Sequence, residues 1–229
     1  MKISLLSLVF LSAFIKTSIA QKPYFTNGSN FIFTYGLVTD TSNKFIKSNV
    51  RFSAWYNFEE ILNIDFSKSA GLITGLGLQN IGIITKPTES ITIKQRTYCL
   101  TLPLGFRFGN LEKKNFLSIG ASAELMIDYK EKVFNGNKKI KHHEFLSNNT
   151  DLLNASVFLR YQKKSIYVSA KYYLYDFLRP SNVQVSDNGF FPLYPNTSQL
   201  LFLSIGYSRK GNESKINTDK PLQKKVNRI

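Results

Sequence analysis

The sequence predicts an all-β protein, specifically an eight-stranded antiparallel up-and-down transmembrane β-barrel. Three observations predict this fold. Apolar and polar residues alternate over long segments, the longest connections between those segments fall at one end, and aromatic residues lie near the segment ends. Alternation with a period of two is typical of a strand with two different faces. No segment shows the 3.6-residue period of an amphipathic helix.

The clearest alternating segment is residues 116–129, FLSIGASAELMIDY. Its odd-numbered positions from Leu117 to Tyr129 are all apolar, whereas most of the intervening positions are small, polar or charged. A strand that crosses a bilayer at a tilt needs about nine to eleven residues, and an aromatic residue commonly marks the membrane surface. We therefore expect the odd-numbered face to contact lipid and Tyr129 to lie at the outer rim.

Seven further segments repeat this alternation. They are residues 31–38, 50–59, 69–84, 98–109, 153–162, 166–175 and 201–208. Pro103 cannot donate a ladder hydrogen bond, so we expect a bulge or local irregularity at that position. The connections near residues 65–68, 109–115 and 162–165 are short, and the two longest, 130–151 and 179–198, fall at the opposite end. Bacterial outer-membrane barrels have short periplasmic turns and long extracellular loops.

The two ends of the chain differ from this pattern. Residues 1–20 predict a cleaved secretory signal peptide, with a basic Lys2, an apolar run, and small residues at Ser18 and Ala20. Lys16 interrupts the apolar run, which disfavours a membrane anchor. The predicted organisation is a signal peptide at 1–20, an N-terminal segment at 21–29, the barrel at 30–208 and a flexible basic tail at 209–229. The predicted location is the cell outer membrane.

The formal net charge is +15. A large positive net charge of this kind is found in proteins that bind nucleic acid or anionic membrane surfaces. Export disfavours nucleic acid, so the expected partners are outer-membrane lipid and other envelope proteins. Five lysines of residues 130–141 either contact the phosphates of outer-leaflet lipid or form a solvated loop. They are Lys130, Lys132, Lys138, Lys139 and Lys141.

Charged residues on the predicted inner face form the main candidate site. The lumen of an eight-stranded barrel is just wide enough to be filled by side chains, and buried charges are costly unless they are paired. We therefore expect a structural polar network across the lumen. Its predicted members are Arg51, Arg107, Glu124, Asp128, Arg160 and Lys171.

A second candidate is an aromatic stretch in the last long connection. Phe190, Phe191, Leu193 and Tyr194 lie close together there. Exposed apolar side chains of this kind mark a surface for partner contact, or they fold into the barrel mouth.

The sequence predicts no enzyme, no cofactor and no metal site. His142 and His143 are the two histidines of the chain, and because they are adjacent they point in different directions. No cysteine or paired carboxylate completes a metal-binding set with them, and Cys99 is the single cysteine. No glycine-rich phosphate loop and no nucleophile elbow is present.

Three segments together resemble a known family. Residues 70–84 (AGLITGLGLQNIGII), 99–109 (CLTLPLGFRFG) and 116–130 (FLSIGASAELMIDYK) resemble consecutive strands of PorT-like outer-membrane β-barrel proteins of Bacteroidota. The likeness covers residues 30–208 and includes a Leu-x-x-Pro-Leu-x-x-x-Phe arrangement at 100–108. It implies an eight-stranded outer-membrane barrel, and some members serve type IX secretion and gliding. Such barrels commonly end on an aromatic residue, whereas here a basic tail follows Tyr207.

These observations favour a small non-enzymatic outer-membrane barrel with a structural or partner-binding role, associated with a secretion or gliding complex. Two alternatives stay open. One is a narrow pathway for ions or small ligands through the barrel, which requires an open lumen. The other is a soluble exported barrel that binds ligands as lipocalins do.

Overall fold

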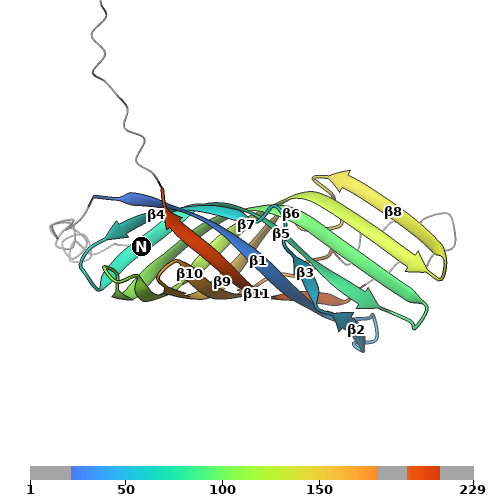
Figure 1. The fold of residues 1–229 in the computed structure, drawn as a ribbon. Coiled ribbons are helices and arrows are strands. Elements are labelled where there is room, and N and C mark those ends of the chain that lie inside the picture. The colour runs from blue at the N-terminus through green and yellow to red at the C-terminus, as the bar shows by residue number, and fades with distance from the viewer. Residues whose placement is uncertain (1–21, 180–194, 212–229) are drawn as a thin grey trace, which may run out of the picture.

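The computed structural model describes residues 22–179 and 195–211. In this part of the chain, eleven strands form a single antiparallel sheet (Figure 1). They are β1 (Tyr24–Thr39), β2 (Phe45–Asn49), β3 (Arg51–Ser53), β4 (Phe58–Asp65), β5 (Ala70–Lys86), β6 (Ile91–Asn110), β7 (Asn115–Asn135), β8 (Lys138–Phe145), β9 (Leu153–Lys163), β10 (Ile166–Tyr173) and β11 (Thr197–Lys210). No helix of these residues has the length and apolar character needed to cross a membrane.

The sheet closes on itself. Strand β1 pairs with β11 from Thr26 and Lys210 to Thr39 and Thr197, so the first and last strands leave no free edge. In the described chain the ring has eight wall positions, because β2, β3 and β4 share one position and β8 pairs only with β7. The predicted eight-stranded antiparallel barrel is confirmed.

Three predicted features lie outside the described residues. They are the signal peptide, the aromatic stretch Phe190, Phe191, Leu193 and Tyr194, and nearly all of the basic tail.

The connections differ between the two ends of the ring. Residues 66–69, 111–114 and 164–165 are tight turns at one end, where β1 begins and β11 ends. The two longest connections, between β7 and β9 and between β10 and β11, lie at the opposite end. This matches the predicted segregation of the two longest connections.

The wall presents apolar side chains outward and polar ones inward. Outward-facing residues around the ring are exposed, among them Leu100, Leu102, Leu104, Phe106, Ile119, Val157, Leu159, Val168, Leu203 and Ile205. Their neighbours along each strand are buried and often polar, such as Thr101, Ser118 and Ser204. This arrangement inverts that of a water-soluble barrel, whose apolar side chains point inward.

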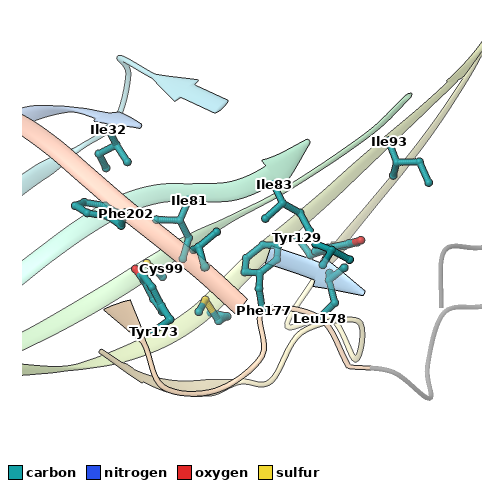
Figure 2. Close-up of a cluster of buried hydrophobic side chains, with 13 residues drawn as sticks. Ile32, Ile81, Ile83, Ile93, Cys99, Tyr129, Tyr173, Phe177, Leu178 and Phe202 are labelled. Carbon is teal, nitrogen blue, oxygen red and sulfur yellow. The ribbon is translucent and has the colours of Figure 1, made fainter. Parts of the chain in front are cut away.

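The half of the lumen nearest the long connections is filled by an apolar cluster (Figure 2). Ile81, Ile83 and Tyr129 project into it from the wall, and Phe177 and Leu178 enter it from the segment after β10. That segment is held in place because Phe177 N donates to Ser198 O at 2.9 Å and Leu178 N donates to Ser198 Oγ at 2.8 Å. The cluster closes this end of the lumen.

A β-bulge in β7 places the residues that follow it on the opposite face of the sheet from the one predicted. Tyr98 of β6 pairs with Asp128, whereas the next residue, Cys99, pairs with Met126, so Ile127 is an extra residue. Tyr129 therefore points into the lumen and is only 2 % exposed, so the expectation that it faces lipid was wrong. Pro103 causes no register shift with β7, where it pairs with Ser122, but the β5–β6 ladder is interrupted beside it, between Leu104 and Thr101. The predicted local irregularity at Pro103 is therefore confirmed.

Two other regions differ from the predicted strands. Residues 130–151, predicted as a connection, instead extend β7 to Asn135 and form β8, which makes a hairpin beyond the ring (Figure 1). The predicted strand at 50–59 is broken, with Tyr56 at a φ of 61° between β3 and β4. Positive φ is uncommon for a bulky residue and interrupts the pleat, which leaves Trp55 77 % exposed instead of facing inward.

Candidate functional site: an ion-pair network in the lumen

Among the described residues, three ion pairs lie inside the barrel, and each joins two different strands. They are Asp65–Arg107, Glu59–Arg160 and Glu124–Lys171. The six charged side chains are between 0 % and 11 % exposed. Because a buried charge without a partner is costly, the one-to-one matching of acids and bases is what permits them to be buried.

The pair nearest the tight turns joins β4 to β6. Arg107 forms an ion pair with Asp65, and its guanidinium group lies 5.0 Å from the centre of the Phe116 ring. The hydroxyl of Tyr24 donates to Asp65 Oδ2 at 3.2 Å and lies 3.3 Å from Arg107 Nη2. This group ties the first strand of the ring to β4, β6 and β7.

The second pair joins β4 to β9. Arg160 makes two hydrogen bonds to Glu59, each 2.7 Å long, in the bidentate geometry that favours a guanidinium–carboxylate pair. The guanidinium group stacks 4.2 Å from the centre of the Tyr167 ring, and Asn30 Nδ2 donates to the Tyr167 hydroxyl at 3.1 Å. Gly206 leaves the space for this ring, because a Cβ atom there would overlap it.

The third pair joins β7 to β10 beneath the apolar cluster. Glu124 Oε1 accepts from Lys171 Nζ at 2.9 Å and from Ser156 Oγ at 2.9 Å. Cys99 Sγ donates to Glu124 Oε2 at 3.5 Å, and Lys171 Nζ also donates to Gln79 Oε1 at 3.1 Å. Five strands of the wall therefore contribute to one hydrogen-bonded group around a fully buried carboxylate.

Four of the six predicted network residues take part in these pairs. They are Arg107, Glu124, Arg160 and Lys171. Two partners were not among the predicted members. Glu59 lies on the face predicted to be inward and was overlooked, whereas Asp65 was assigned to a turn. Asp65 could have been found from the alternation, because Glu59, Asn63 and Asp65 all occupy odd-numbered positions and therefore share one face of the strand.

Arg51 and Asp128 are not part of the lumenal network, so these two predictions were wrong. Arg51 donates to Asn80 O at 2.9 Å and to Asn80 Oδ1 at 2.6 Å. Asn80 follows Gln79 and therefore lies on the opposite face of β5 from the lumen. The bulge in β7 turns Asp128 outward, where its Oδ1 lies 2.6 Å from His143 Nε2.

The geometry supports a structural role for the lumenal charges. No group of three or more His, Cys, Asp or Glu side chains in the described residues is placed to hold a metal ion. The lumenal carboxylates are each engaged by a base, and the apolar cluster covers the network on one side. At the tight-turn end, a cavity of about 370 Å³ is lined by residues that include Arg107 and Asp65. The network can fix the strand register.

Comparisons with known proteins give likenesses of shape only. No family model and no curated protein matches the chain. Ail, the attachment invasion locus protein of Yersinia pestis, has a TM-score of 0.43 at 12 % identity, and its complex with the heparin analogue sucrose octasulfate has 0.39 at 10 %. The N-terminal β-barrel domain of Pseudomonas aeruginosa OprF has a TM-score of 0.35 at 8 % identity. Each match covers 82 % of this chain and 100 % of the other. The barrel assignment rests on the strand pairing described above.

Replacing Glu124 with Gln is expected to destabilise the barrel by about 3–5 kcal/mol, because Lys171 is left as a buried charge without a partner. The measurement is the urea-induced unfolding of barrels folded into lipid vesicles, followed by the mobility shift of the folded form on a gel. The matched control is Glu112→Gln, which removes an exposed ion pair to Lys68 and is expected to change stability by less than about 1 kcal/mol.

The double variant Glu124→Leu/Lys171→Met separates charge burial from packing. Since it removes both charges, it is expected to recover most of the lost stability. An unfolding midpoint for Glu124→Gln equal to that of the wild type would contradict the structural role of the pair.

Proposed function

We propose that this protein is a non-enzymatic β-barrel of the bacterial outer membrane with a closed lumen and a structural or partner-binding role. The observation that carries this proposal is the inverted distribution of side chains, with an apolar outer surface around a lumen that contains three ion pairs.

The outer surface fits a lipid environment. Leu104, Ile119 and Leu203 are between 48 % and 62 % exposed although they sit in the middle of regular strands. Exposed apolar surface costs about 25 cal/mol per Å² in water, and a continuous band of it marks contact with lipid or a partner. Near the tight turns the outward aromatics include Phe108, Tyr161 and Tyr207, and towards the other end Tyr56 meets Tyr98 edge-on at 6.0 Å. Aromatic side chains are favoured at both interfaces of a bilayer.

The filled lumen favours the structural role over an ion or ligand pathway. The three ion pairs lie across the lumen at its middle and towards the tight turns. The apolar cluster fills the end of the lumen near the long connections. The ion pairs and the apolar cluster follow one another along the lumen, which disfavours the continuous column of water that a conducting path needs.

Reconstituted barrels are expected to show two properties together. Trp55, the single tryptophan of the chain, is exposed beside the Tyr56–Tyr98 pair, so its fluorescence should be quenched by lipids with brominated acyl chains. Planar bilayers that contain the protein should show no stepwise conductance. Absence of quenching would favour the soluble barrel, and discrete channel openings would favour the pathway.

The tight turns are expected to face the periplasm and the β7–β8 hairpin the cell exterior. A membrane-impermeant maleimide should therefore label Asn137→Cys, but not Lys113→Cys, in intact cells that express the full chain. The wild type is the unlabelled control, because its Cys99 is completely buried. Labelling of Lys113→Cys alone would reverse the proposed orientation.

We further propose that the protein is attached to a type IX secretion or gliding complex. Its support is the resemblance of residues 70–84, 99–109 and 116–130 to PorT-like barrels. Co-purification of partners from crosslinked outer membranes is the measurement that tests it, and recovery of the barrel without any envelope protein would count against it.

A further inference from the structure

One face of the sheet beyond the ring is almost entirely basic. Beyond the point where β9 stops pairing with β7, strands β5, β6 and β7 continue as one sheet, with β8 as its outer edge (Figure 1). We call its outward side the basic face. It consists of Lys94 and Arg96 on β6, Lys130 and Lys132 on β7, and Lys139, Lys141 and His143 on β8.

The strand register places these cations directly opposite one another. Lys132 pairs with Lys94 on one side and with Lys141 on the other, which makes a row of three lysines across three strands. The next row joins Lys130 to Arg96 and His143. Side chains opposite each other on adjacent strands have Cβ atoms about 4.5–5.5 Å apart, and like charges at this distance destabilise the sheet. The repulsion within these rows therefore costs the fold stability, although Lys94 and Lys139 also lie over the Phe134 ring, at 5.2 and 5.3 Å from its centre.

Acidic residues do not compensate for this charge. Among the described residues of the face, the one acid is Asp128, at its lower edge beside His143. Glu131 lies on the other side of the sheet, where its Oε2 accepts from Gln95 Nε2 and from the Tyr129 hydroxyl, each at 2.9 Å. Partial burial and the positive charges of the surrounding lysines and Arg96 lower the pKa of Lys132 below its ordinary value.

The basic face lies on the same side of the wall as the apolar band. Along β6, the outward residues run from Leu102 and Leu100 through Tyr98 to Arg96 and Lys94. Apolar side chains thus give way first to an interfacial aromatic and then to cations, with the tyrosine ring 5.1 Å from the Arg96 guanidinium group. In a membrane, this order puts the cations at the depth of the lipid headgroups.

We propose that the basic face binds phosphorylated headgroups of outer-leaflet lipids. This inference rests on the proposed membrane placement. Adjacent rows of cations suit a headgroup that carries more than one phosphate, because neighbouring lysines can each donate to a different oxygen. The phosphates would also neutralise the repulsion within the rows.

The test uses the full chain in phosphatidylcholine nanodiscs and measures the binding of added lipid by native mass spectrometry. Diphosphorylated lipid A is the probe, and dephosphorylated lipid A with the same acyl chains is its control. The test variant is Lys94→Gln/Lys132→Gln/Lys141→Gln. The matched variant is Lys44→Gln/Lys113→Gln/Lys138→Gln, which removes the same charge from exposed positions outside the basic face.

The wild type is expected to prefer the phosphorylated lipid, and the test variant is expected to bind it about 100-fold more weakly, given the usual contribution of each lysine near an anionic surface. The matched variant should bind as the wild type does. Equal binding of both lipids, an equal loss in both variants, or inorganic phosphate competing at the concentration of the lipid phosphates would each overturn the proposal.

Two further measurements separate this inference from its premises. Quenching of Trp55 by brominated lipid in the same nanodiscs shows whether the barrel is embedded, whatever the lipid preference. The unfolding midpoint of the test variant should equal or exceed that of the wild type, because like-charge pairs have been removed. A lower midpoint would assign the lysines a structural role and overturn the proposal.

Discussion

The matching of charges inside the lumen is the constraint on which the rest of the structure depends. An eight-stranded ring encloses too little space for water to solvate isolated charges, so every buried acid needs a base from another strand. Glu59 reaches Arg160 across the lumen, and Glu124 reaches Lys171. A slip of one residue in either strand would turn one partner outward, which means that the pairs select a single register for strands far apart in the chain.

The two halves of the lumen are filled by different kinds of side chains, polar at one end and apolar at the other. Near the tight turns, Arg107 and Asp65 are polar groups beside a cavity that opens to solvent. Beneath the long connections, the closure is apolar, and it draws Phe177 and Leu178 from outside the strands. Glu124 lies where the two kinds of packing meet, which explains why its carboxylate is held by Ser156 and Cys99 as well as by Lys171.

Much of the fold could be predicted from the sequence, because strand alternation is a local property. The eight wall positions, their order and the facing of Arg107, Glu124, Arg160 and Lys171 follow from it. The pairing of these charges could not be predicted, because it depends on which strands face each other across the ring. The hairpin of β7 and β8 was missed since residues 130–145 lack an apolar face long enough to indicate strands. The bulge could not be predicted either, because Ile127 and Tyr129 are both apolar and the alternation of apolar and polar residues continues across them without a break.

That one extra residue also determines what the barrel presents to its surroundings. Below Ile127 the even-numbered residues of β7 face the lumen, as Glu124 and Met126 do; above it the odd-numbered ones do. Without the bulge, Lys130 and Lys132 would point into the apolar cluster, where their charges would have no partner. With it, Tyr129 fills the cluster and both lysines align with Lys94 and Arg96 on the outer side. The bulge therefore closes the lumen and creates the basic face in a single step, so that the inner packing and the outer charge pattern depend on the same residue.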